Sequence, residues 1–143
     1  MNTKIISAKE AVNLLIETHP SVLKDGWCPI LFTGDRITCC DEASVVEIAG
    51  KIVALATIAP EGEMGEGHPT IVGLYTVREH RCKGYGKTVL VTAIKRCLER
   101  GFSQIHMDVL TPKAMKTIQS LSTELKAELS ISDQTKFGGY ILD

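Results

Sequence analysis

Apolar residues follow a helical spacing in the first part of the chain. Between Ser7 or Ala8 and about Thr18 they recur every three or four positions, as in an amphipathic helix. Ser7 is a predicted N-cap, and Glu10 stands in the capping-box position. The residues before Ser7 are interpreted as the approach to this helix. Pro20 ends it, and a short second helix is predicted directly afterwards.

A stretch rich in valine and isoleucine then predicts a β-hairpin. It spans 44–59, and Gly50 lies at the centre of the expected turn. A loop rich in glycine and glutamate follows over 60–69. The next segment, Thr70–Val77, is mostly apolar, and strands of this kind are buried on both faces inside a sheet.

A long amphipathic helix is the strongest pattern in the second half of the chain. It is expected from about Tyr85 to Arg100, with its apolar residues on one face. Gly101 can adopt the left-handed conformation that ends such helices. A further strand is predicted over 104–110.

The remaining pattern predicts one more helix and two strands. Thr111 is an expected N-cap, and Pro112 suits the first helical position. Apolar and polar residues alternate over 125–131, which favours a strand there over a continued helix. A final strand is predicted over 137–142.

The composition is that of an ordinary globular chain of 143 residues. Hydrophobic residues make up 44%, but no apolar run approaches the roughly 20 residues that span a bilayer. The start of the chain lacks the pattern of a secretory leader. A net charge of -1 offers no electrostatic footprint for nucleic acid or an anionic membrane. We therefore expect a single domain over 1–143, located in the cytoplasm, with neither nucleic acid nor membrane as a partner.

Five cysteines are present, an odd number without the CxxC spacing of zinc or redox motifs. We expect neither a disulfide framework nor a metal site, and reduced thiols fit a cytoplasmic protein. The adjacent Cys39 and Cys40 are interpreted as ordinary, partly buried thiols rather than as a redox pair.

The most informative run is Arg81-Cys82-Lys83-Gly84-Tyr85-Gly86-Lys87-Thr88, between a predicted strand and a predicted helix. Gly84 and Gly86 allow the backbone to approach a ligand closely. The helix that begins there directs unpaired N–H groups and the positive end of its dipole to the same place. A junction of this kind is suited to binding phosphate.

Two common phosphate-binding motifs do not fit the spacing. A Walker A loop requires a glycine five residues before Gly86, where this chain has Arg81. The dinucleotide fingerprint requires a small residue three positions after Gly86, where this chain has Val89. We therefore expect no magnesium-dependent nucleotide binding.

The pattern Arg81-x-x-Gly84-x-Gly86, after a strand and at the start of a long helix, resembles the acyl-CoA loop of the GNAT N-acetyltransferase superfamily. The wider phrase 74–87 is similar to that family's strand-loop-helix consensus. With the predicted order of elements, the resemblance covers nearly the whole chain. It implies a mixed α/β (α+β) fold, in which a mostly antiparallel central sheet of about six or seven strands is flanked by helices.

The resemblance also implies that acetyl-CoA is the cosubstrate and that no metal is required. Backbone amides at the start of the helix would hold the pyrophosphate, and Lys83 and Lys87 would add charge at the rim. In the family, the strand before the loop splays from its neighbour and binds the pantetheine arm. The expected cofactor residues are Tyr75, Thr76, Val77, Arg81, Cys82, Lys83, Gly84, Tyr85, Gly86, Lys87 and Thr88.

The catalytic groups are less clearly marked than the cofactor loop. Family members commonly protonate the leaving thiolate with a tyrosine on the helix after the fifth strand, and this chain has Ile118 at the matching position. Tyr140 and Tyr75 are the candidate substitutes. Glu47, on the first hairpin strand, is the candidate general base.

Two functions of different class follow from the resemblance. The first is direct transfer of an acetyl group from acetyl-CoA to an amine of a small molecule or a protein, with the acceptor unidentified. The alternative is a catalytically silent acyl-CoA-binding or regulatory module, which the isoleucine at position 118 favours. The terminal strands offer edges through which two copies would pair as a homodimer.

Overall fold

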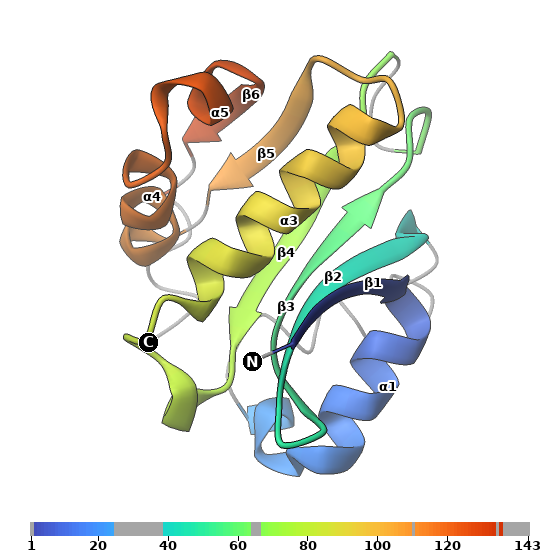
Figure 1. Cartoon of the computed structure of the whole chain (residues 1–143), viewed down its shortest axis with the longest axis vertical. Helices are drawn as coiled ribbons and strands as arrows, with labels where there is room; N and C mark the ends of the chain where they lie inside the picture. The colour runs from blue at the N-terminus through green and yellow to red at the C-terminus, as the bar shows by residue number, and fades with distance from the viewer. Residues whose placement is uncertain (1, 25–38, 64–66, 110, 134, 136–143) are drawn as a thin grey trace.

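The described part of the chain forms a six-stranded sheet with helices on both faces (Figure 1). The structure is a computed structural model that describes residues 2–24, 39–63, 67–109, 111–133 and 135. The elements are β1 (Asn2–Ser7), α1 (Ala8–Thr18), a 3-10 turn η1 (Pro20–Lys24), β2 (Glu42–Ile48), β3 (Lys51–Ala59), β4 (Thr70–Thr76), a 3-10 turn η3 (Arg78–His80), α3 (Tyr85–Glu99), β5 (Ile105–Val109), α4 (Pro112–Gln119), α5 (Thr123–Ala127) and β6 (Leu129–Asp133).

The strands lie in the sheet in the same order as in the chain. Strands β1 to β4 are antiparallel, whereas β4 with β5 and β5 with β6 are parallel. The α3 helix connects β4 to β5, as parallel neighbours require a long crossover. The mixed, mostly antiparallel sheet predicted from the sequence is therefore confirmed. In the described part of the chain, no helix is both long and apolar enough to cross a membrane.

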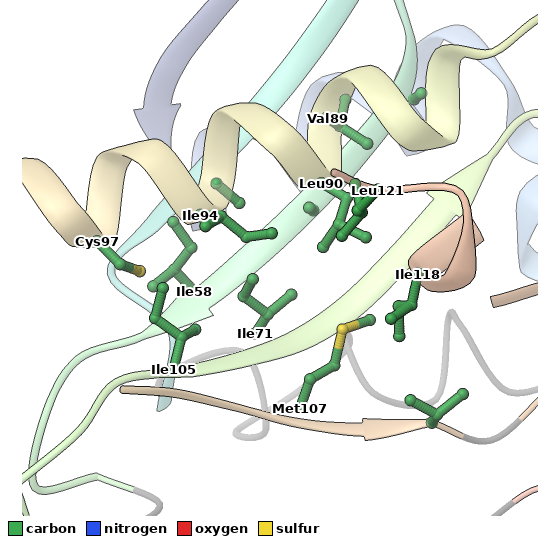
Figure 2. Close-up of a cluster of buried hydrophobic side chains, with 14 of the residues drawn as sticks. Ile58, Ile71, Val89, Leu90, Ile94, Cys97, Ile105, Met107, Ile118 and Leu121 are labelled. Carbon is green, nitrogen blue, oxygen red and sulfur yellow. The ribbon is translucent and has the colours of Figure 1, made fainter. Parts of the chain in front are cut away.

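The two faces of the sheet carry separate apolar cores. One core lies between the sheet and α3 with α4, and the other lies between the sheet and α1. Figure 2 shows the first core, in which side chains of α3 contact those of β3, β4 and β5. Leu90 and Ile94 are fully buried at its centre. This packing fixes the axis of α3 relative to the strands, and so the place where its N-terminus lies.

Truncating Leu90 to alanine is expected to lower the free energy of unfolding by about 2–5 kcal/mol, because it leaves a cavity in this core. Leu14 on α1 is 39% exposed and provides a matched control. Its change to alanine is expected to cost less than about 0.5 kcal/mol. Urea unfolding followed by circular dichroism measures both. Equal losses in the two variants would contradict the described packing.

Two predicted helix starts are confirmed by their hydrogen bonds. The Glu10 amide donates to Ser7 Oγ at 3.1 Å, and the Ala114 amide donates to Thr111 Oγ1 at 3.0 Å. Pro112 occupies the first turn of α4, as expected. Each cap satisfies an amide that the helix itself leaves without a partner.

The first strand was not predicted, because the residues before Ser7 were interpreted as the approach to a helix. They instead form β1, which pairs with β2 along its whole length. Lys4 and Glu47 form an ion pair across these strands, with Nζ and Oε1 2.7 Å apart. The residues of β1 pair with residues of β2 that lie at least 35 positions further along the chain, and a local sequence pattern does not include that partner.

The strand predicted over 125–131 is wrong in its first half. Residues Thr123–Ala127 form the short helix α5, because Ser122 Oγ accepts a hydrogen bond from the Leu125 amide at 3.3 Å. The strand β6 begins only at Leu129 and pairs with β5. The final strand predicted over 137–142 lies outside the described residues.

Candidate functional site

A β-bulge interrupts β4 shortly after the strand begins. Ile58 pairs with Ile71 and the adjacent Thr57 pairs with Gly73, so Val72 is an extra residue on β4. The side chains confirm the irregularity, because Val72 and Leu74 pack on opposite faces of the sheet although they are two positions apart. A bulge bends its strand and increases the local twist.

The pairing between β4 and β5 ends at this bulge. Its two pairs are Thr70 with His106 and Ile71 with Met107. Beyond these pairs the two strands are no longer paired, and their C-terminal ends lie apart in Figure 1. The bulge thus directs the end of β4 away from its parallel neighbour.

The backbone groups of β4 beyond the bulge face two different edges. The Val77 amide donates to Val53 O of β3 at 2.8 Å. Because successive residues of a strand direct their N–H and C=O groups to opposite edges, those of Tyr75 also face β3. Those of Leu74 and Thr76 face the side of β5. Of the three strand residues expected from the sequence, Thr76 therefore directs its backbone groups to the side of β5, as Leu74 does, whereas Tyr75 and Val77 direct theirs to β3.

A sharp loop joins β4 to α3. Cys82 and Gly84 both have positive φ, at 63° and 85°, and Gly84 is the N-cap of α3 without a side-chain capping bond. The Thr88 amide donates to Gly84 O at 3.1 Å and is the first in the helical ladder. The four amides of 84–87 therefore precede that ladder, as at any helix N-terminus. They and the helix dipole favour an anion at this position.

The start of α3 lies next to the end of β4. A Cβ atom added at Gly86 would be 3.6 Å from Thr76 Oγ1, which is an ordinary van der Waals distance. A Cβ atom at Gly84 would meet no described atom within 4 Å. Position 84 therefore favours glycine because of its positive φ, and not because a side chain there would collide with other described atoms.

Arg81 holds the loop against β4. Its Nε donates to Thr76 O at 2.9 Å, and its guanidinium carbon lies 5.5 Å from the centre of the Tyr75 ring. The contact combines a charge-assisted hydrogen bond with a cation–π interaction. Arg81 thus positions the loop, which a resemblance in sequence does not reveal.

The two lysines of the loop have different surroundings. Lys87 Nζ donates to Ser120 O at the end of α4, at 2.9 Å, so this ammonium connects α3 to α4. Lys83 is exposed. Thr88 Oγ1 donates to Gly84 O within its own helix at 3.0 Å, and the Tyr85 ring lies 6.3 Å from that of His80. Lys87 therefore makes a contact between two helices, whereas Lys83 makes no such contact in the described residues.

The described cysteines differ in accessibility. Burial raises the pKa of the Cys40 thiol to about 12 and that of Cys97 to about 11. Cys39 Sγ and Cys40 Sγ are 3.7 Å apart, but a thiol that stays protonated at neutral pH is a poor nucleophile. Cys82 is exposed in the loop between β4 and α3.

Alkylation of the thiols gives a simple test of where the ligand binds. We expect iodoacetamide at neutral pH to modify Cys82 well before Cys40 or Cys97, because the thiolate is the reactive form and burial disfavours it. Saturating acetyl-CoA should slow modification of Cys82 at least about fivefold, since the ligand would cover the loop. Peptide mass mapping measures each rate. An unchanged rate at Cys82 would contradict binding at this loop.

The expected catalytic residues lie in three different situations. Glu47 faces the α1 side of the sheet, where its carboxylate pairs with Lys4. Val77, at the end of β4, lies on the far side of β3, so the two backbones are separated by roughly 10 Å. Ile118 is 2% exposed and packs in the core under α3 (Figure 2). Tyr140 lies outside the described residues.

A pair of polar residues lies near the bulge, and one of them, His106, was not singled out from the sequence. His106 Nε2 and Asp108 Oδ1 on β5 are 3.0 Å apart, and the ring of His68 lies 5.7 Å from that of His106. Positions 106 and 108 share one face of a strand, and this spacing was the available signal.

A family model described as "Acetyltransferase (GNAT) family" matches residues 9–119. No curated protein sequence matches the chain. The matched range contains the bulged strand, the loop and all of α3.

Solved structures of acetyltransferases share the fold. A ribosomal-protein-alanine N-acetyltransferase from Brucella melitensis biovar Abortus 2308 is 15% identical, with a TM-score of 0.59 over 86% of this chain and 92% of that one. An aminoglycoside acetyltransferase from an uncultured soil metagenomic sample, in complex with sisomicin, is 14% identical, with a TM-score of 0.60 over 83% and 85%. The aminoglycoside N-acetyltransferase AAC(6')-Iy, in complex with CoA, is 12% identical, with a TM-score of 0.57 over 85% and 90%.

Proposed function

The chain belongs to the GNAT acetyltransferase family, and we propose that it transfers an acetyl group from acetyl-CoA to an amine of a small molecule or a protein. One observation carries the proposal. The separation of β4 from β5 at the Val72 bulge lies beside a helix N-terminus whose N-cap, Gly84, has no side-chain cap. A ligand that carries both a pyrophosphate and an extended amide arm matches this combination.

The pyrophosphate would lie at the start of α3. The amides of 84–87 supply donors, the helix dipole favours the negative charge, and exposed Lys83 adds a cation. Cys82 and Gly84 hold the loop in the positive φ conformation that presents these amides. Arg81 fixes the loop to Thr76 and Tyr75, while Lys87 fixes α3 to α4.

The pantetheine arm would run along the edge of β4 that faces β5. Leu74 presents its N–H and C=O on that edge, and Thr76 presents its N–H there while its C=O accepts from Arg81 Nε. The amides of the arm would bind to these groups as an added strand does. Tyr75 and Val77 would contribute through the shape of the strand, because their backbone groups face β3. The arm would then end near Val72, where the two strands come together.

The transfer step requires a neutral amine nucleophile and a stabilised thiolate leaving group. Glu47 is a candidate base on the α1 face, although use of its carboxylate would require release from Lys4. Tyr140 remains a candidate acid from the sequence, with Tyr75 as its alternative. Glu47→Gln and Tyr140→Phe are expected to lower turnover about tenfold or more if they fill these roles.

A second function is favoured by one observation. Ile118, at the position where family members commonly carry a tyrosine, is buried in the core. A chain that kept the cofactor loop and lost its acid would bind acyl-CoA as a silent or regulatory module. Pairing of two copies through edge strands, to form a homodimer, stays a prediction in both cases.

Thiol release from acetyl-CoA with a panel of amines separates these functions. The panel should contain polyamines, aminoglycosides and peptides with free N-terminal or lysine amines. The proposed transferase predicts thiol release that depends on one class of amine, with the acetylated amine identified by mass spectrometry. Tight acetyl-CoA binding without release for any amine would favour the silent module. Absence of acetyl-CoA binding would contradict both.

A further inference from the structure

A histidine–carboxylate pair lies on β5 close to the bulge. His106 Nε2 and Asp108 Oδ1 are 3.0 Å apart, and the side chains are 30% and 49% exposed. A carboxylate only accepts hydrogen bonds, so Nε2 of the neutral imidazole carries the proton and donates it to Asp108. The second ring nitrogen, Nδ1, is then an acceptor, and the described residues provide it with no partner.

The pair stands where the two parallel strands separate. His106 is opposite Thr70, and the next pair, Ile71 with Met107, is the last between β4 and β5. Asp108 is therefore the first residue of β5 beyond the pairing. An extended arm that begins at the α3 N-terminus and follows β4 backwards reaches its end at this level of the sheet.

The pair also faces the appropriate side of the sheet. Ile105, Met107 and Val109 are buried in the core under α3 (Figure 2). Because side chains alternate along a strand, His106 and Asp108 lie on the opposite face. The α3 helix, which would hold the cofactor, thus covers one face of the sheet. His106 and Asp108 lie on the other face, where they would contact an amine acceptor that approaches from that side.

Neighbouring strands place few charges against His106. Thr70 of β4 and Ser130 of β6 lie directly opposite it, and Ser132 lies opposite Asp108. Thr70 Oγ1 is buried without a hydrogen-bond partner in the described part of the chain. His68 lies in the loop before β4, and the centre of its ring is 5.7 Å from the centre of the His106 ring.

We propose that His106 is the general base of the acetyl transfer and that Asp108 positions it. The nitrogen lone pair of the amine forms the new C–N bond, and the C–S bond of the thioester breaks with its electron pair on sulfur. The proton lost by the amine goes to His106 Nδ1, from which it passes to the thiolate or to solvent. The inference rests on the proposed function and names a base other than Glu47 within it.

The test compares His106→Gln, Asp108→Asn and a matched control, His68→Gln, in the thiol-release assay with the best amine of the panel. We expect His106→Gln to lower kcat about 10²- to 10⁴-fold, with the Kd for acetyl-CoA unchanged. Asp108→Asn should lower kcat about ten- to a hundredfold without raising the KM for acetyl-CoA. His68→Gln should stay within about threefold of the parent. Added imidazole should partly restore turnover in His106→Ala.

Each contrary outcome is distinguishable. Turnover in His106→Gln equal to that of the parent would overturn the inference and leave the proposed function intact. An equal loss in His68→Gln would assign the base to His68 and also overturn it. A parent protein that binds acetyl-CoA without any amine-dependent release would overturn the proposed function and this inference together. Thermal unfolding of each variant verifies that it is folded.

Discussion

Replacing Gly84 with glutamate is expected to weaken acetyl-CoA binding about a hundredfold, or ~3 kcal/mol. Gly84 has a φ of 85°, which costs a residue with a side chain about 1–3 kcal/mol. The new carboxylate would also compete with the phosphates for the amides at the start of α3. Isothermal titration with acetyl-CoA measures the loss directly.

Gly101 supplies the matched control for this substitution. It lies just beyond the other end of the same helix with a φ of 93°, and an added Cβ atom would meet no described atom there either. Gly101→Glu introduces the same charge and a similar backbone strain far from the proposed site. We expect both variants to lose thermal stability and only Gly84→Glu to lose affinity. Equal affinities in the two variants would show that the loop is not the cofactor site.

Deleting Val72 is expected to lower acetyl-CoA affinity at least about tenfold while leaving the protein folded. Without this extra residue β4 loses its bulge, so its end straightens and can extend its pairing with β5. Leu74 should still face the α3 side of the sheet and Tyr75 the α1 side. The reason is that removal of the extra residue restores a regular alternation of side chains from Ile71 onwards. Calorimetric titration and a thermal unfolding curve measure the two effects.

Val72→Ala is the control, since it shortens the side chain and retains the extra residue. It should bind acetyl-CoA within about threefold of the parent. A folded deletion variant with the parent's affinity would show that the separation of β4 from β5 is not needed for binding. A loss of affinity in Val72→Ala equal to that of the deletion would assign the effect to the side chain instead of the bulge.

The long, locally consistent elements were predictable from the sequence. The helix from Tyr85 has an apolar face, a glycine at each end and a loop whose spacing already excluded two other phosphate sites. Ser7 and Thr111 marked helix starts because their hydroxyls act within three residues. Signals of this kind are local, and the fold preserves them.

What escaped prediction depends on partners that are distant in the chain. The first strand exists because β2 pairs with it, and α5 forms in a stretch whose alternation is equally compatible with a strand. The bulge at Val72 can be recognised only from the pairing of β4 with β3. His106 is a candidate base because it contacts Asp108 and lies where the β4–β5 pairing ends. The second of these features depends on two strands that are distant in the chain.

The buried Ile118 bears on how the leaving thiolate is stabilised. Ile118 is apolar and buried in the core under α3, so it cannot donate a proton. This chain therefore has no acid at the position of α4 where family members commonly carry a tyrosine. If His106 accepts the proton of the amine, the resulting imidazolium is itself a proton donor. A single histidine would then serve both halves of the transfer, which makes the loss of the tyrosine compatible with activity.

We propose that acetyl-CoA binds at the start of α3 and along the end of β4. Amide hydrogen exchange with and without saturating acetyl-CoA tests it most directly, because the amides of 84–87 precede the helical ladder and depend on a ligand for protection. Binding at this place predicts slower exchange in peptides that cover 82–88 and 73–77, with no change around Gly101. Unchanged exchange in 82–88, or protection confined to other parts of the chain, would contradict it.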